Sequence, residues 1–277
     1  MTYHHRGAPN LNRAWRQQLE DVMKYGQVVA PRGMETKELP QKTLVFDMLH
    51  PVITVPERSL GYKFMAAEAW WLLSGHNDVA SIAPYSKAIS QFSDDGETFF
   101  GSYGPPFVEQ LIYVVSALQN DPDTRQATMT FWRQNPPKTK DVPCTIAIDF
   151  KLRGGRLNTH VFMRSSDNWL GIPYDAFNFT MMTCRVLELL NAGLPDGNKI
   201  CPGTMHLTAA SSHLYARNFP EVVAVLRSPI VPSLTNPLPK HLYGIYTDPS
   251  ARYEGLIRYL EVLKDVQADQ VSEYRWW

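Results

Sequence analysis

A change in hydrophobic period near the middle of the chain most constrains its fold. Residues 145–152 have the composition of a β-strand, and apolar side chains alternate again over residues 157–163. The turn between them carries Gly154-Gly155 at its centre, which is typical of a β-hairpin. A long apolar segment, residues 173–192, follows and meets Gly193, a residue that commonly ends helices. The pattern predicts a hairpin within a sheet, beside a long and largely buried helix.

The remaining segments predict further helices and strands without a regular order. Helices are expected at residues 11–25 (capped by Asn10 and stopped at Gly26), 60–74, 107–118 and 250–272, and strands at residues 127–131 and 202–208. Residues 27–59 have a pattern of loop and strand, and residues 76–106, rich in Ser, Asp, Gly and Pro, have the composition of an irregular, lid-like segment. Neither the βαβ rhythm of a dinucleotide-binding fold nor a Gly-rich phosphate loop is present. We expect one mixed α/β domain over residues 1–277.

Composition narrows the class of function. Lys and Arg number 27 and Asp and Glu number 27, so the chain offers no excess cationic charge to nucleic acid or to an anionic membrane. Three cysteines without zinc-site spacing predict no metal site and fit a reducing compartment. The longest apolar stretch, residues 111–118, is too short to span a bilayer, and the first ten residues lack a signal-peptide core. A soluble, cytoplasmic protein is expected.

Chemistry-bearing residues concentrate between positions 143 and 175. Cys144 follows Pro143 at the start of a predicted strand, where a thiol can be exposed enough to act as a nucleophile. A cysteine taken alone is more often a small buried hydrophobe. Arg164 and Ser165 end the next strand and have the donors that bind a phosphate, although such a segment is equally common as a charged surface turn.

Together these residues resemble the thymidylate synthase superfamily. Its members carry a nucleophilic cysteine, an Arg-Ser-x-Asp segment and then Leu-Gly-x-Pro-Phe-Asn, and this chain carries Cys144 followed by MRSSDNWLGIPYD. The resemblance covers roughly residues 15–220, so residues 220–277 form a divergent C-terminal region. It implies a large mixed sheet flanked by helices, packed back to back with a second sheet in a homodimer.

The resemblance also implies the roles of individual residues. Cys144 would be the nucleophile, Glu68 the general acid/base, and Tyr103 the group that assists proton removal from the pyrimidine ring. A glutamate on an otherwise apolar helix is costly to bury, which favours a functional role for Glu68 independently. The 5′-phosphate would be bound by Arg32, Arg164, Ser165 and the partner's copy of Arg125, the sugar by His213 and Tyr215, and the folate by Asp167, Gly171 and Trp71. A tryptophan such as Trp71 is, however, more often a core or pocket-wall residue than a cofactor contact.

One departure from the synthases bears on the base. Asp175 stands where they carry asparagine, whose amide matches the N3–H and O4 of uracil. Cytosine offers a 4-amino donor and an unprotonated N3, and a carboxyl group accepts from the first and, when protonated, donates to the second. Asp175 therefore favours cytosine, as in the cytidylate hydroxymethylases of the superfamily, and Thr145 and Met163 also resemble that branch.

This branch implies a hydroxymethyl transfer with 5,10-methylenetetrahydrofolate as the carbon donor. Residues 88–92 replace the tryptophan-rich segment that shields the synthase cofactor site, so water is expected where a synthase admits only hydride. The alternatives are a thymidylate synthase, a uridylate hydroxymethylase or a catalytically silent nucleotide-binding homologue. Phage DNA modification and nucleoside-antibiotic synthesis would both use such an enzyme.

Ala176 bears on the choice of sugar. It follows the base-reading residue at the start of a predicted helix, and its small side chain would leave space for a 2′-hydroxyl, which favours CMP. Alanine is also the best helix former, and this interpretation explains the residue equally well.

Overall fold

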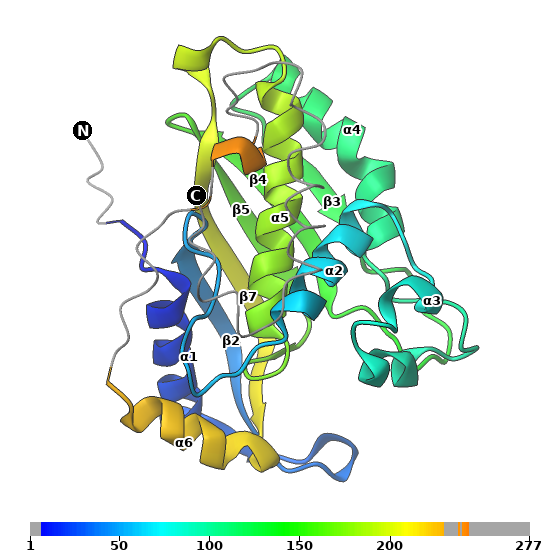
Figure 1. Ribbon diagram of the computed structural model, residues 1–277, viewed down its shortest axis with the longest axis vertical. Coiled ribbons are helices and arrows are strands. Elements are labelled where there is room, and N and C mark those ends of the chain that lie inside the picture. The colour runs from blue at the N-terminus through cyan, green and yellow to red at the C-terminus, as the bar shows by residue number, and fades with distance from the viewer. Residues whose placement is uncertain (1–6, 230–237, 239, 244–277) are drawn as a thin grey trace.

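The computed structural model describes residues 7–229, 238 and 240–243, and one mixed sheet forms its centre (Figure 1). Its strands are β1 (Gln27–Val29), β2 (Thr36–Asp47), β3 (Thr128–Thr130), β4 (Thr145–Arg153), β5 (Arg156–Met163), β6 (Ser166–Asp167) and β7 (Cys201–Tyr215). The order across the sheet is β1-β2-β7-β5-β4-β3, and β6 also pairs with β7. β7 runs parallel to β5 and β6, and the other neighbours are antiparallel. The expected mixed sheet is confirmed.

The predicted hairpin is also confirmed. β4 and β5 pair directly, with Arg153 opposite Arg156, and Gly154 and Gly155 adopt φ values of 58° and 72° between them. Only glycine takes two such left-handed conformations in succession without a steric penalty, which explains the sequence of this turn.

The helices flank this sheet. They are α1 (Leu11–Tyr25), α2 (Tyr62–Leu73), α3 (Val79–Ile82), α4 (Gly104–Asn120), α5 (Ile172–Asn191) and α6 (Phe219–Arg227). Short 3-10 turns lie at Pro31–Gly33, Lys87–Phe92, Asp196–Asn198, Ala216–Asn218 and Lys240–Tyr243. α5 packs on β5 and β7, and α2 and α4 pack on α5. The helical segments that the sequence predicts before residue 200 are therefore present.

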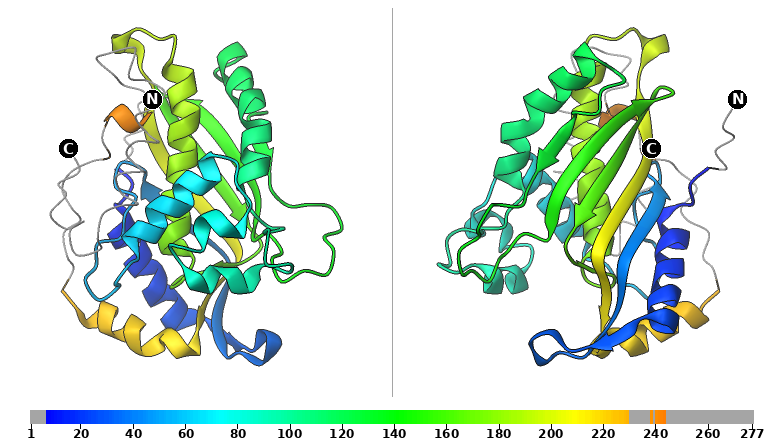
Figure 2. Two further views of the ribbon diagram at one scale, coloured as in Figure 1. Left: turned by 45° about the vertical axis from the view of Figure 1, so that its right-hand side comes forward. Right: turned by 180° about the vertical axis from the view of Figure 1, so that it is seen from behind.

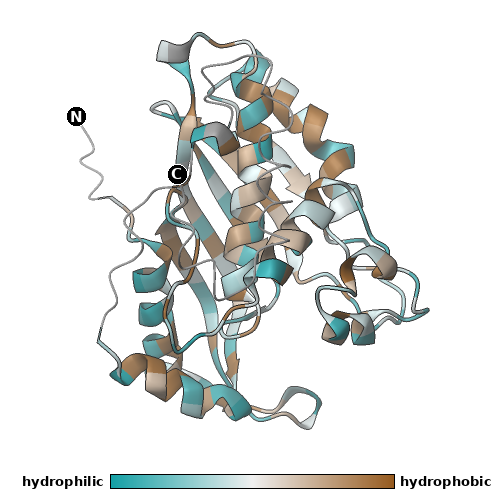
Figure 3. Cartoon of the chain, viewed as in Figure 1, coloured by the Kyte–Doolittle hydropathy of each residue, from teal (hydrophilic) through white to brown (hydrophobic). Residues whose placement is uncertain are grey.

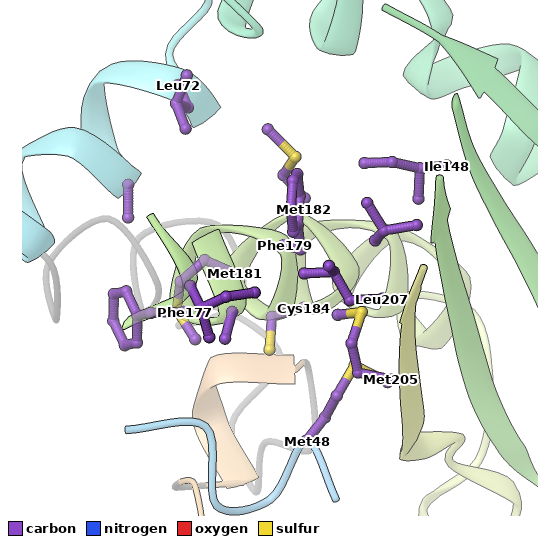
Figure 4. Close-up of a cluster of buried hydrophobic side chains, with 14 of the residues drawn as sticks. Met48, Leu72, Ile148, Phe177, Phe179, Met181, Met182, Cys184, Met205 and Leu207 are labelled. Atoms are coloured by element: carbon purple, nitrogen blue, oxygen red, sulfur yellow. The ribbon is translucent and has the colours of Figure 1, made fainter. Parts of the chain in front are cut away.

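The core lies between α5 and the sheet. Phe179, Met182 and Cys184 of α5 belong to one buried apolar cluster with Ile148 of β4 and with Met205 and Leu207 of β7 (Figure 4). Apolar and polar residues alternate along β5 and β7 (Figure 3), so that one face of each strand enters this core. The near-continuous apolar character of α5 follows from its contacts on several sides.

Several boundaries differ from the sequence prediction for identifiable reasons. α1 is capped as expected, because the Asn10 side chain accepts from the Arg13 N–H at 3.0 Å. α4 begins at Gly104, earlier than predicted, with prolines in its first turn. β7 extends to Tyr215, well past residue 208, because pairing with β2 continues through its polar end. The predicted helix at 250–272 lies outside the described residues.

The opposite face of the sheet is free of described helices. Seen from behind, β4, β5 and β7 lie open in Figure 2. Phe162 is 44% exposed on this face, and the His160 and His206 rings stack beside it at 4.7 Å. No described helix has the length and apolar character needed to cross a membrane. Among the described residues, no group of three or more His, Cys, Asp or Glu is placed to bind a metal ion.

Candidate active site

The nucleophile candidate lies at one end of the sheet, immediately before β4. The carbonyl of Cys144 accepts from the N–H of Arg164, which directly follows β5. The Arg164 guanidinium donates to the carbonyls of Pro143 and Val142, both at 2.9 Å. Burial raises the pKa of the Cys144 thiol, and the nearby Arg164 partly opposes this shift. The arginine therefore both fixes the backbone around the thiol and favours its thiolate.

Tyr103 joins the same site from the start of α4. Its Oη accepts from the N–H of Thr145 at 3.2 Å, one residue after the nucleophile. Its ring packs edge-on against Phe131 and stacks on Phe179. Burial, and then the charge of Cys144, raise the pKa of Tyr103 well above its ordinary value. The phenol therefore stays protonated and can relay a proton through its hydroxyl without carrying a lasting negative charge.

Glu68 and Asp175 bring two carboxyl groups together from different helices. Glu68 lies on α2 and Asp175 in the first turns of α5, and both side chains keep partial exposure. Burial raises the pKa of Glu68 to about 7. Burial, together with the charges of Glu68 and Asp167, raises the pKa of Asp175 to about 8. At neutral pH the pair therefore retains protons, and its titration belongs to both groups together.

Residues expected to bind phosphate and sugar gather where β2, β5 and β7 meet. β6 places Asp167 opposite His213, and Ser165 Oγ lies 3.5 Å from His213 Nδ1. The Tyr215 ring packs edge-on against His213. Arg32 is exposed in the turn before β2, with φ 54°, and its charge acts on Cys144. Ser165, His213, Tyr215 and Arg32 thus converge at the end of the sheet that carries the nucleophile.

Arg125 does not join this group. It is exposed after α4, next to a loop whose Pro122 and Asp123 carbonyls accept from the Arg153 guanidinium at the hairpin end of β4. β4 has nine residues and is therefore about 30 Å long. Because Cys144 precedes the other end of this strand, Arg125 lies far from the nucleophile of its own chain.

The segment between the motif and α5 is tightly organised. Asp167 Oδ1 accepts from the N–H groups of Trp169 and Leu170 at 2.8 and 3.0 Å. A Cβ on Gly171 would lie 3.0 Å from the carbonyl oxygen of Asp167 and 3.1 Å from Asp175 Oδ2. Glycine is therefore needed where this loop passes the Asp175 carboxyl.

Comparison with known proteins fits this geometry. A sequence model described as thymidylate synthase matches residues 13–240. The chain belongs to the thymidylate synthase family. It is 34% identical over 225 residues to a deoxyuridylate hydroxymethyltransferase of Bacillus phage SP01, covering 73% of this chain and 56% of the relative. A protein of the same name from Pseudomonas phage M6 is 31% identical over 153 residues, covering 52% and 44%. The chain thus spans about half the length of these curated relatives.

Membership of the thymidylate synthase family confirms the resemblance inferred from the motif around Cys144. The family match continues to residue 240, beyond the point near residue 220 where the sequence motifs stop aligning. α6, in this added part, was not predicted, and it packs on α1. The family likeness therefore includes part of the region expected to be divergent.

Two residues that the sequence analysis assigned to ligand contacts are buried in the structure. Trp71 is 4% exposed, donates to the Asp78 carbonyl at 3.1 Å and packs edge-on against Phe99. Ala176 is completely buried and belongs to the core. For Ala176, burial favours the packing interpretation over open space for a hydroxyl. Trp71 likewise has a packing role in this structure.

Asn178 is a site residue that the sequence interpretation missed. Its Nδ2 donates to Glu68 Oε2 at 2.8 Å, and the side chain is 5% exposed. The available signal was its position three residues after Asp175, which places both on one face of α5. The donated hydrogen bond opposes the effect of burial on Glu68.

Proposed function

We propose that this protein is a pyrimidine nucleotide hydroxymethyltransferase that acts on a cytidine 5′-monophosphate. It would convert CMP or dCMP to the 5-hydroxymethyl derivative with 5,10-methylenetetrahydrofolate and water. The observation that carries this proposal is the half-buried Asp175 carboxyl, near Glu68 and within the electrostatic reach of Cys144 and Tyr103. Family membership supports one-carbon transfer to a pyrimidine nucleotide.

The protonation of Asp175 supports the choice of cytosine. With a pKa raised to about 8, this carboxyl is mostly neutral at pH 7. A neutral carboxyl accepts from the 4-amino group and donates to N3, giving two hydrogen bonds on one edge of the base. It could also pair with uracil, but N3 of cytosine is a much stronger base than the O4 carbonyl of uracil. The shared proton therefore favours cytosine.

The chain's own residues supply each remaining step. The Cys144 thiolate would add to C6 and make C5 nucleophilic. Tyr103, held by the Thr145 N–H, would help remove the C5 proton. Glu68 would deliver water to the exocyclic methylene that forms at C5, and Cys144 would then leave C6. The folate would supply the one-carbon unit, and the well-ordered Asp167–Gly171 loop fits a role in positioning it.

A homodimer would complete the phosphate site. Arg32, Arg164 and Ser165 surround the nucleophile's end of the sheet, whereas Arg125 lies at the far end of β4. Arg125 can serve a nucleotide only if a second copy brings it there. The open sheet face, with Phe162 exposed on it, supports a back-to-back arrangement of two copies.

The nearest alternative is a uracil nucleotide as substrate. The two relatives are named deoxyuridylate hydroxymethyltransferases, which favours this candidate. The complete burial of Ala176 removes the sequence-based reason for preferring CMP, so the proposal covers CMP and dCMP equally.

A single incubation series tests the proposal. The protein is supplied with methylenetetrahydrofolate and CMP, dCMP, UMP or dUMP in turn, and the product is identified by mass. We expect hydroxymethylation of CMP, dCMP or both, without the absorbance rise that accompanies dihydrofolate. Hydroxymethylation of dUMP or UMP alone would support the second candidate, and a methylated product with dihydrofolate would indicate a thymidylate synthase.

A further inference from the structure

Asn178 presents an unusual combination of contacts. Its Nδ2 donates a hydrogen bond to Glu68 Oε2, while its Oδ1 is buried and has no hydrogen-bond partner among the described residues. The side chain is 5% exposed, so bulk solvent does not satisfy this oxygen. An unpaired buried acceptor is unfavourable, and it is retained most readily where it serves a bound group.

The position of Asn178 defines what that group can be. Asp175 and Asn178 lie three residues apart on α5, and Glu68 contacts Asn178 and acts electrostatically on Asp175 from α2. The carboxyl group assigned to the base and the amide of Asn178 thus both lie near Glu68. A water molecule has two hydrogens, so it can donate one to the Glu68 carboxylate and the other to Asn178 Oδ1.

We propose that Asn178 is a positioning residue that orients Glu68 and, through its Oδ1, holds the water that attacks the exocyclic methylene. The inference rests on the proposed hydroxymethyltransferase function and names the group that makes water the nucleophile. The bound water donates one hydrogen to Glu68 and the other to Asn178. Its lone pair is then free to point at the methylene carbon.

The step balances without a further reactant. The water oxygen forms a bond to the exocyclic methylene carbon, and its proton passes to the Glu68 carboxylate. The electron pair of the carbon–carbon double bond moves into the pyrimidine ring. Expulsion of the Cys144 thiolate from C6 then restores the C5–C6 double bond. No oxidant or reductant is needed, in contrast to transfer of a hydride.

Asn178 also serves the ionisation that this step needs. Glu68 must accept a proton, so its carboxylate form must be available while burial opposes it. The hydrogen bond from Asn178 Nδ2 stabilises that form, whereas the neighbouring Asp175 opposes it when ionised. Asn178 therefore lowers the pH above which the Glu68 carboxylate can accept the proton.

Competition between water and an added thiol tests the inference. A small thiol such as 2-mercaptoethanol would add to the same exocyclic methylene and give a 5-thioether nucleotide. At fixed thiol concentration, the ratio of thioether to hydroxymethyl product reports how well water is held. The variants are Asn178→Ala and the similarly sized Asn178→Leu, which both remove the amide donor and acceptor. The control is Thr180→Val, which removes a buried hydrogen bond to the Ala176 carbonyl on the same helix.

We expect both Asn178 variants to raise the thioether ratio roughly tenfold, the effect of one lost hydrogen bond, with the nucleotide KM nearly unchanged. The pH at which kcat rises should move upward by roughly half a unit to one unit. Thr180→Val should change neither. Asn178→Leu keeps the approximate size of the side chain, so a role in packing alone predicts near-normal behaviour for it.

The outcomes separate the two proposals. If the wild-type protein hydroxymethylates a nucleotide but the product ratio is unchanged in folded Asn178→Ala and Asn178→Leu, the water site is wrong and the function stands. Should Asn178→Ala fail to fold, the ratio in Asn178→Leu alone decides. If the wild-type protein gives no hydroxymethylated nucleotide, the proposed function is wrong and the water site with it.

Discussion

The proton on Asp175 makes a quantitative prediction about nucleotide binding. The pKa of this carboxyl is raised to about 8, chiefly by burial, so its neutral form is present below pH 8 and is lost above it. Cytosine pairs best with the neutral form, because the ionised form places an acceptor against the lone pair of N3. The affinity for CMP or dCMP should therefore be retained at pH 7 and decline as the pH rises through 8.

The expected size follows from the titration. A group with a pKa near 8 is about 90% protonated at pH 7 and about 10% protonated at pH 9. If only the neutral form binds, Kd rises about tenfold between these two values. Asp175→Asn removes the ionisable group, so its Kd should stay constant over the same range, and its preference should move toward uracil nucleotides.

Binding is best measured by calorimetry in a Cys144→Ala background. The substitution removes the thiol, which would otherwise form the covalent adduct. The nucleotide phosphate loses its second proton near pH 6, so measurements from pH 7 upward avoid it. A Kd for CMP and dCMP that stays constant from pH 7 to 9 with Asp175 intact would refute the reasoning, as would an equal pH dependence in Asp175→Asn.

Three further predictions follow from the same site. Cys144→Ala should abolish product formation, measured by mass analysis, while the nucleotide Kd at pH 7, measured by calorimetry, changes only a few-fold. Turnover in this variant would exclude the covalent mechanism. Glu68→Gln should raise the free energy of unfolding, relative to wild type, by up to about 3 kcal/mol more at pH 8 than at pH 4. The reason is that a carboxyl with a raised pKa contributes stability below its ordinary pKa of 4.5, and this contribution is lost as the pH rises through about 7. Urea denaturation of both proteins at both pH values measures this change, and an equal difference between them at pH 4 and pH 8 would contradict the burial argument. Mixing inactive Arg125→Ala and Cys144→Ala subunits should restore activity in mixed dimers, because the first subunit supplies Cys144 and the second supplies Arg125 to the same site. No recovery of activity after subunit exchange would mean that Arg125 does not act across an interface.

Local patterns were sufficient for most of the fold. The Gly154-Gly155 turn and the alternation on either side of it identify the β4–β5 hairpin, and the apolar run after residue 173 identifies α5. The C-terminal end of β7 was not predicted, because residues 211–213 are polar and break the alternation of apolar and polar side chains. Their burial comes from pairing with β2 and from contacts with Asn168, which no local pattern records.

The candidate site could be identified in part because its motif is nearly continuous. Arg164 to Asp175 forms one run, and Cys144 lies one hairpin earlier, so sequence order reflects proximity there. The contact between Glu68 and Asn178 joins residues 110 positions apart, and only the packing of α2 on α5 reveals it. The depth of Ala176 and Trp71 depended on tertiary packing in the same way, so short-range patterns could not predict it.

Proton uptake on binding provides a last, independent test of Asp175. If cytosine binds only the neutral carboxyl, linkage requires that the bound nucleotide raise the pKa of Asp175 further. At pH 8 about half of the free protein carries this proton, so binding should take up about half a proton per site, and closer to one at pH 9. Calorimetry in buffers of different ionisation enthalpy measures this uptake directly in the Cys144→Ala protein. A uracil nucleotide should take up less, because its O4 is a poor acceptor for the shared proton. Equal uptake with CMP and UMP would show that Asp175 does not distinguish the bases by protonation, and zero uptake at pH 9 would show that it reads the base as a carboxylate.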